Sequence, residues 1–527
     1  MSSQPPNSIN VFANDPNAKG LGLEQTAPPA GKSPFSIPGW TGAGGLFSPG
    51  SPEFEAGELY FVLTRTYAAW SDFFGADFGW EPGFALLPIV PRAGQDFNAY
   101  YDRTGLKFFY NTDPKVNQVV YACESSDVVA HECGHAVLDA HHPEYWDSLL
   151  GETGAFHEAF GDMSAMLVTL GDPAVRAEIL AENGGDLAKS NAVSRLAEQL
   201  ARAIYDAGNP NAVVSPDALR DAVNAFKYRA PDTLPGSAPA SQLSSESHNF
   251  SRIFSGAFYD SLVGIYGQLR KADSTMTPDA ALAQARADAG HLLAQGLLLA
   301  PKGDAPFKTI ATSMITADAQ NFGGKYFAVL RAAFVGRQII SASEAKQLRA
   351  TRGAAHTRTS ALLGTASASV GTPTTVDPTR LRIGEEVPAN VRRAVRAPRR
   401  PFQLVEDRRR RDNSHVLHYT STRSMELKGK AMGAAQGVVV DLPDSLAVQV
   451  DRDGRVVSSH YHKSDRAHAK RVRDHVEKLI ARGRVYEARE GETVDSAKLI
   501  EQKKPYYVAY DRAGVKRIRR SFIACGL

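Results

Sequence analysis

The stretch Asp127-Val-Val-Ala-His-Glu-Cys-Gly-His-Ala-Val-Leu-Asp139 contains a His-Glu-x-x-His pattern. This pattern is the starting point from which the fold of the chain is inferred. On an α-helix, residues four apart differ by about 40° around the axis, so His131 and His135 leave one face on adjacent turns. Two imidazoles placed in this way can hold one Zn²⁺ ion, and Glu132 can act as the base for a water beside it. Apolar neighbours predict a buried helix over about residues 125–140. Burial favours pairing or metal binding, because unpaired buried polar groups are costly.

A third ligand is needed, and the sequence offers two candidates. His141 follows His135 by six residues, as in three-histidine zinc sites, but the helix would have to break between them, and Leu138 stands where a glycine is usual. Glu158 lies in Gly154-Ala-Phe-His-Glu-Ala-Phe-Gly-Asp162, whose apolar spacing predicts a helix packed on a core. A carboxylate there needs a partner, which favours Glu158. Asp162, one turn later, can accept the second ring N–H of a zinc histidine.

These segments together resemble the thermolysin family of gluzincin zinc metallopeptidases, which pair His-Glu-x-x-His with a later glutamate and an acid four residues on. The resemblance spans roughly residues 50–340. It implies an α+β fold with a β-rich lobe over about 51–145 and a helical lobe over about 146–340. It also implies that His131, His135 and Glu158 bind Zn²⁺ and that Glu132 is the general base.

The resemblance extends to residues that would contact the substrate. Asn98-Ala-Tyr-Tyr101 resembles the family's substrate-edge segment, so Asn98 and Ala99 are expected to meet the substrate backbone. The stretch at residues 247–259 resembles the segment whose histidine stabilises the transition state, which implies this role for His248. Glu246 could orient that histidine. Tyr145 is a candidate second donor to the oxyanion, and Arg229 a candidate contact to a substrate carbonyl.

The chain also departs from the family pattern. His157 stands behind the ligands where the family usually has asparagine, and the gap between His135 and Glu158 is longer than usual. Asp127 fits a calcium-ligand position, but no convincing set of partner acids follows Glu158, so the case for calcium is weak. The family's long N-terminal propeptide is absent.

The function expected from these residues is a zinc-dependent endopeptidase acting on a peptide or protein substrate. Two alternatives remain open. One is a binding or delivery protein with a protease-like core, and the other is a zinc aminopeptidase of the same clan. An aminopeptidase needs an acidic cluster for the substrate amine, and the sequence does not point to one.

Composition sets the broad class of the protein. The chain has 527 residues, of which 43% are apolar and 22% charged, as is ordinary for a soluble protein of several domains. Its net charge of +3 argues against nucleic acid as a partner. The three cysteines do not form a disulfide framework, and Cys133 is expected to be packed on the far side of its helix. Neither a signal peptide nor a membrane span is apparent, which favours a cytoplasmic protein and leaves signal-independent export open.

The pattern along the chain predicts four parts. Residues 1–50 are rich in Pro, Gly and Ser and predict an extended arm; residues 51–340 form the peptidase domain; residues 341–400 form a linker; residues 401–527 form a small basic α+β domain. Strands are expected within 84–121. Helical spacing recurs at 59–74, 152–170, 193–207, 216–227, 248–271, 278–299, 306–318 and 325–338.

The last domain resembles no family, and its pattern predicts two hairpins with a basic helix between them. The hairpins are expected at residues 446–457 and 506–518, and the helix at 464–482. Its histidines lack an acid or cysteine at metal-ligand spacing, so no second metal site is predicted; they are His460, His462, His468 and His475. Arginines concentrated between residues 392 and 411 are interpreted as a solvated edge. The domain could bind a protein partner, either for targeting or to present a substrate.

Overall fold

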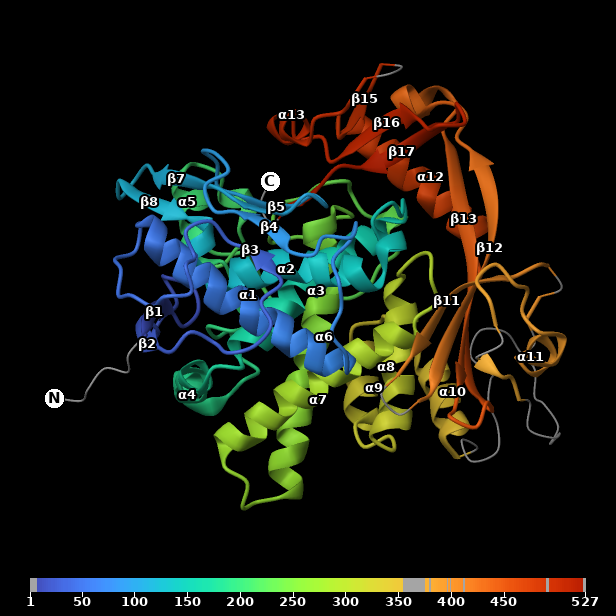
Figure 1. Cartoon of the computed structure of the whole chain (residues 1–527), viewed down its shortest axis with the longest axis horizontal. Coiled ribbons are helices and arrows are strands. Elements are labelled where there is room, and N and C mark those ends of the chain that lie inside the picture. Colours follow the sequence, from blue (N-terminus) through green and yellow to red (C-terminus); the bar gives the residue numbers. More distant parts are fainter. Residues whose placement is uncertain are drawn as a thin grey trace.

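The computed structural model in Figure 1 describes residues 7–353, 375–378, 381–395, 397–398, 400–410, 413–489 and 492–524. The protein is a mixed α+β structure, 43% helical and 19% strand, which confirms the predicted class. Part of the predicted linker, residues 354–374, and Cys525 lie outside the described residues. The N-terminal unit, residues 7–340, and the C-terminal domain, residues 401–524, are named in this way below.

Long helices packed on one another form the centre of the N-terminal unit (Figure 1). They are α1 (Pro52–Phe74), α2 (Ser126–His141), α3 (Gly151–Thr169), α6 (Ser247–Ala272), α7 (Pro278–Leu299), α8 (Phe307–Asn321) and α9 (Phe327–Gly336). Shorter helices are α4 (Pro173–Ala181), α5 (Glu198–Asp206) and α10 (Ala342–Gly353). The predicted helices near these bounds are confirmed. Ser125 explains where α2 begins, since its hydroxyl accepts the backbone N–H of Val128 as an N-cap.

Short strands occur in the part of the N-terminal unit that precedes α2 in the sequence. They are β1 (Ile9–Phe12), β2 (Leu23–Thr26), β3 (Phe35–Ser36), β4 (Leu87–Val90), β5 (Ala99–Tyr101), β6 (Leu106–Phe108), β7 (Tyr110–Asp113) and β8 (Gln118–Tyr121). The strands predicted within 84–121 are therefore present. The segment predicted as an extended arm is held against the helices, because Ile9 and Val11 are buried in the main core.

The helix predicted over residues 216–227 is wrong. The chain there forms β10 (Arg220–Asp221), which pairs with β9 (Arg195–Leu196), so the helix predicted from residue 193 begins only at Glu198. The side chain of Asp221 accepts the backbone N–H of Val223, and Asn224 does the same for Phe226. Such side-chain bonds to the local backbone compete with helix formation.

In the residues that the structure describes, the C-terminal domain contains two sheets and two α-helices, and it contains both predicted hairpins. Its strands are β11 (Gln403–Arg409), β12 (His415–Glu426), β13 (Val439–Val450), β14 (Val456–His462), β15 (Val485–Glu487), β16 (Tyr506–Tyr510) and β17 (Lys516–Arg520). The helices are α12 (Arg466–Ala481) and α13 (Ser496–Glu501), and α11 (Ala389–Ala394) precedes the domain. The helix predicted at 464–482 is confirmed by α12.

The C-terminal domain packs directly on the N-terminal unit. Leu149 and Leu150, which precede α3, are buried in the same apolar cluster as the inner face of α12. Lys302 is almost fully buried; its ammonium donates to the carbonyl of His141 and lies 3.1 Å from a carboxylate oxygen of Glu406 on β11. Apolar and charged contacts therefore both fix the domain.

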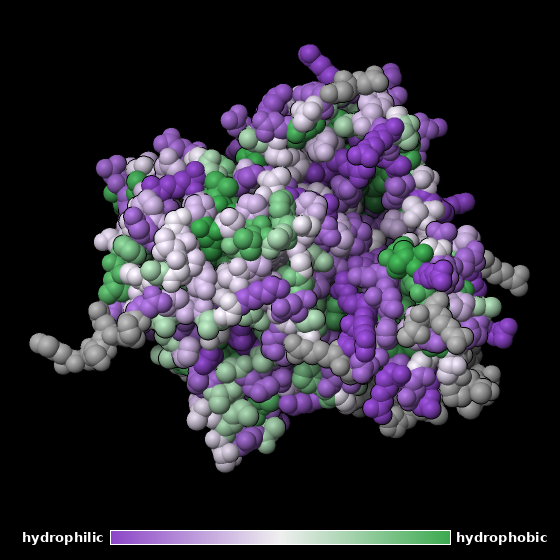
Figure 2. Space-filling model, viewed as in Figure 1, coloured by the Kyte–Doolittle hydropathy of each residue, from purple (hydrophilic) through white to green (hydrophobic). Residues whose placement is uncertain are grey.

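The last described strand lies in a sheet of the N-terminal unit rather than in a sheet of the C-terminal domain. Strand β18 (Ile523–Ala524) pairs antiparallel with β5, and Figure 1 shows the end of the chain returning from β17 to this place. The sheet order is β18-β5-β6-β4-β3. On the face shown in Figure 2, hydrophilic side chains are interspersed with smaller apolar areas. In the described part of the chain, no helix combines the length and apolar character needed to cross a bilayer.

Candidate metal centre

Helices α2 and α3 approach each other closely around the His-Glu-x-x-His pattern. A Cβ on Gly161 of α3 would lie 2.6 Å from the imidazole of His131, and one on Gly134 of α2 would lie 2.9 Å from Cβ of Ser164. Only glycine fits at either position without displacement of a neighbour. The two glycines therefore let the face of α2 that carries the histidines pack against α3.

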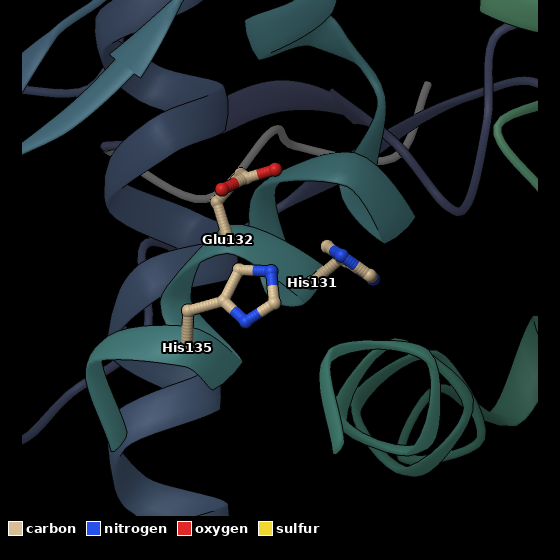
Figure 3. Close-up of side chains that lie close together, drawn as sticks. All are labelled: His131, Glu132 and His135. Atoms are coloured by element: carbon tan, nitrogen blue, oxygen red, sulfur yellow. The ribbon is translucent and has the colours of Figure 1, made fainter. Parts of the chain in front are cut away.

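The predicted ligands lie together in a fully buried position. Figure 3 shows the side chains of His131, Glu132 and His135 on α2, with the two imidazoles on adjacent turns. One ligand atom from each of these residues lies within 4.8 Å of the other two. From α3, a carboxylate oxygen of Glu158 lies 3.6 Å from Nε2 of His131. These residues could hold a metal ion.

Unsatisfied polar atoms support metal binding at this centre. Nε2 of His131, both ring nitrogens of His135, both carboxylate oxygens of Glu132 and Oε2 of Glu158 are buried without a hydrogen-bond partner. Buried polar groups in native proteins are almost always satisfied. A cation facing these atoms would satisfy several of them at once.

Asp162 lies behind His131, as the sequence predicts, and Arg220 holds it there. Nδ1 of His131 is 3.2 Å from Oδ1 of Asp162. The same carboxylate accepts from Nε and Nη2 of Arg220 at 3.0 and 2.9 Å, and from the hydroxyl of Ser255 at 2.9 Å. A ring N–H donated to Asp162 leaves the Nε2 lone pair free for a metal. Sequence reasoning missed Arg220 because it placed this residue on a helix that does not form.

His248 lies at the edge of the centre, at the start of α6. Its Nε2 is 3.4 Å from Oε2 of Glu158, and its Nδ1 is 2.8 Å from Oε1 of Glu246. Glu246 is also the N-cap of α6, since it accepts the backbone N–H of Asn249. One carboxylate therefore both begins the helix and orients the histidine, as the sequence suggested.

Burial and neighbouring charges set the protonation of the centre. Burial lowers the pKa of His135 well below its ordinary value, so the ring is neutral, as a metal ligand must be. Burial raises the pKa of Glu132 to about 8, and a cation at the centre would lower it again, so that the carboxylate could accept a proton near neutral pH. Burial acts to lower the pKa of His248, but the carboxylates of Glu158 and Glu246 outweigh it and raise the pKa to about 9. The imidazole of His248 is therefore protonated at neutral pH.

Several other candidate residues lie away from the centre. His141 is not a third ligand: α2 continues unbroken to it, its ring stacks on Phe74, and its Nδ1 bonds the carbonyl of Val137. Tyr145 is fully buried and stacked on His142, outside the cavity beside the centre. Arg229 is exposed and also outside that cavity.

His157 and the calcium candidate have different surroundings. The ring of His157 is buried 5.8 Å from that of His135, centroid to centroid, and neither of its nitrogens has a hydrogen-bond partner. Asp127 accepts from the backbone N–H of Ala197, and the hydroxyl of Ser125 lies within hydrogen-bonding distance of the carboxylates of both Asp127 and Asp15. Within the ranges the structure describes, Asp127 does not belong to a group of three ligand atoms within 4.8 Å.

The C-terminal domain covers the open side of the centre. A cavity of about 90 Å³ is lined by Asn98, Glu158 and His248 from the N-terminal unit. Its remaining walls come largely from α12 and the last strands, including His475, Tyr506, Arg520 and Phe522. Asn98 thus lines the cavity beside the centre, and Ala99 begins β5, the strand that pairs with β18; their contact with a substrate stays a prediction.

Comparison with known proteins does not assign the chain to a family. No protein-family model matches the chain, and no curated protein matches it.

Proposed function

We propose that this protein is a zinc-dependent endopeptidase of the thermolysin-like gluzincin type. The main support for the proposal is that metal-binding nitrogen and oxygen atoms of His131, His135 and Glu158 are buried without hydrogen-bond partners. The carboxylate of Glu132 lies beside them. Two imidazoles and one carboxylate are the ligands of catalytic zinc sites that keep a fourth position open. Asp162 behind His131 is the kind of partner that fixes a metal-binding tautomer.

The bound ion would supply Lewis acidity and a water whose pKa is lowered to about 7. Glu132 takes a proton from the attacking water and returns it to the leaving amine. His248, protonated and oriented by Glu246, donates its Nε2–H to the carbonyl oxygen as negative charge develops there. A donor of this kind contributes about 2.7–4 kcal/mol of transition-state stabilisation.

The proposal is tested by zinc content and peptide cleavage in matched variants. Glu132→Gln is expected to retain zinc and to lose cleavage of an N-blocked peptide by about 10²–10⁴-fold, because only the base is removed. Glu53→Gln, an exposed carboxylate at the start of α1, serves as the control and is expected to cleave normally. Normal cleavage by Glu132→Gln would contradict the mechanism. Activity confined to peptides with a free amine would favour the aminopeptidase alternative.

A further inference from the structure

A second group of metal-type side chains is buried between the N-terminal unit and the C-terminal domain. Asp304 comes from the loop between α7 and α8, His462 ends β14, and His468 lies in the first turn of α12. One ligand atom from each lies within 4.8 Å of the other two. Their exposed fractions are 5%, 7% and 1%. The acid that these histidines lack in the sequence is thus supplied by a distant part of the chain.

Asp304 lies within ion-pair distance of one of the two histidines, and buried ring nitrogens of the group remain without hydrogen-bond partners. Nε2 of His468 lies 2.8 Å from Oδ2 of Asp304, and Nδ1 of the same ring is buried without a hydrogen-bond partner. Nε2 of His462 is also buried without a partner. An ion pair between Asp304 and His468 alone would leave Nε2 of His462 buried without a partner. The same pattern of unsatisfied nitrogens marks the first metal centre.

The surroundings orient the carboxylate toward the histidines. The hydroxyl of Ser148 donates to Oδ1 of Asp304, which leaves Oδ2 to face His468. A hydrogen bond of this kind, behind a ligand, is usual in metal sites. The nearby guanidinium of Arg471 interacts with the carboxylate of Glu152, so its charge is partly balanced.

We propose that Asp304, His462 and His468 bind a second divalent cation of the zinc class, which joins the C-terminal domain to the N-terminal unit. Two imidazoles and one carboxylate suit Zn²⁺, whereas Ca²⁺ and Mg²⁺ take oxygen ligands. The complete ligand set exists only while the domain is docked. Binding of the ion therefore stabilises the docked state by linkage.

The test is zinc stoichiometry, measured by elemental analysis on the full chain loaded with zinc chloride and then dialysed. The wild type is expected to hold two zinc ions, and Asp304→Asn, which keeps the size of the side chain, is expected to hold one. His135→Ala, at the first centre, is also expected to hold one, and the double variant none. His460→Ala, two residues before a proposed ligand, is the matched control and is expected to hold two.

A milder substitution shows whether the loss of zinc reflects the site itself and not a failure of the protein to fold. Ser148→Ala is expected to weaken zinc binding at this site by about 10–100-fold and to leave the first centre unchanged. A wild-type protein with one zinc ion, lost in His135→Ala, would overturn the proposal. So would two zinc ions in Asp304→Asn. Because the two sites are counted separately without turnover, failure here is distinct from failure of the proposed peptidase.

A separate observation concerns the last residues of the chain. Ile523 and Ala524 pair antiparallel with Tyr101 and Tyr100 of β5, next to Asn98 at the cavity. Arg520, just before them, donates from Nε to the carbonyl of Trp146 at 2.8 Å, and its own carbonyl accepts from the indole N–H of Trp146 at 3.2 Å.

Helix α12 also holds the C-terminal domain against the N-terminal unit. The ammonium of Lys478 on α12 donates to the carbonyls of Pro231 and Leu234 at 2.7 and 2.9 Å. A Cβ on Gly151 at the start of α3 would lie 2.8 Å from the ring of His475, so α12 packs tightly there. The cavity of about 90 Å³ beside the first centre is lined in part by residues of α12 and of the last strands, which narrow it on this side.

We infer that the segment 520–524 occupies the substrate cleft in cis, lying along β5 where an extended peptide would bind. This inference rests on the proposed peptidase function. Addition of a strand to a sheet edge is a common way to bind an extended peptide. A substrate can then bind only in the fraction of molecules whose domain has moved away, and its apparent affinity falls by that fraction.

The test compares Arg520→Ala with Arg519→Ala, a neighbouring arginine whose side chain pairs with Asp147 at the surface. Arg520→Ala is expected to raise kcat/KM for an N-blocked peptide by about 10- to 100-fold, the range for lost hydrogen bonds to a charged group. It should strengthen binding of a peptide hydroxamate, a zinc-directed probe, by a similar factor. Arg519→Ala should change neither.

Probe binding separates the two claims. Stronger hydroxamate binding without any cleavage would support the covered cleft and contradict the peptidase. Equal hydroxamate binding by the wild type and Arg520→Ala would overturn the covered cleft, whatever the cleavage rate. Elemental analysis should find at least one zinc ion in each variant, which shows that the first centre is intact, because only the site that contains Asp304 can empty when the domain moves away.

Discussion

Replacement of Arg220 by methionine should destabilise the protein strongly, because it breaks a buried ion pair. The exposed fractions of Arg220 and Asp162 are 5% and 2%, and the guanidinium donates to the carboxylate from Nε at 3.0 Å and from Nη2 at 2.9 Å. Methionine fills much of the same space but leaves Asp162 as a buried charge with Ser255 and His131 as its partners. Removal of one partner from such a pair costs about 3–5 kcal/mol. Zinc affinity should fall by about 10–100-fold, because the acid behind a ligand is disturbed.

The assay is equilibrium unfolding of the metal-free protein in denaturant, at several pH values. Burial raises the pKa of Asp162, but Arg220 outweighs it and lowers the pKa to about 2. The stabilisation is therefore complete above the unfolded pKa of about 3.9 and is lost as pH falls toward about 2. The difference between wild type and Arg220→Met should be largest near neutral pH and should shrink over that acid range. A difference below about 1 kcal/mol at pH 7 would refute the reasoning, since the surface value would then apply.

Two further predictions concern the same centre. Gly161→Ala should cost about 1–3 kcal/mol and reduce zinc content, because the added methyl meets an imidazole at 2.6 Å; calorimetry and elemental analysis measure this. Gly267→Ala on α6, whose Cβ would meet nothing within 4 Å, is the control and should be neutral or slightly stabilising. Glu246→Gln removes a carboxylate that helps to raise the pKa of His248 to about 9. Because the protonated ring is the active form, the alkaline limb of the kcat/KM profile should move to lower pH; an unmoved limb would argue against His248 as the donor.

The local pattern of the sequence was sufficient to place the candidate ligands on helices. The apolar spacing around Asp127-to-Asp139 and around Glu158 predicts α2 and α3, and the four-residue repeat places the two histidines on one face. The choice of Glu158 over His141 also follows from local chemistry, since no glycine breaks α2. These features depend on residues within one helical turn of each other, where periodicity is informative.

Features that depend on long-range pairing could not be predicted in this way. The side chains of Asp221 and Asn224 accept the backbone N–H groups of residues two positions further along, and these bonds compete with a helix. In the resulting strand and loop, Arg220 reaches Asp162. Asp304 meets His462 and His468 across the interface between two parts of the chain. The pairing of β18 with β5 joins residues separated by most of the chain. Sequence periodicity carries no information on such partners, because a strand of two residues has too short a pattern to identify its neighbour.

The most direct test of the central claim compares Arg520→Ala with Arg520→Ala/Glu132→Gln, so that the cleft is uncovered in both proteins. Zinc content is measured by elemental analysis, and cleavage of an N-blocked peptide is followed in the same samples. The account predicts equal zinc in the two proteins and cleavage slower by about 10²–10⁴-fold in the double variant. Equal cleavage by both, or no zinc in either, would contradict it.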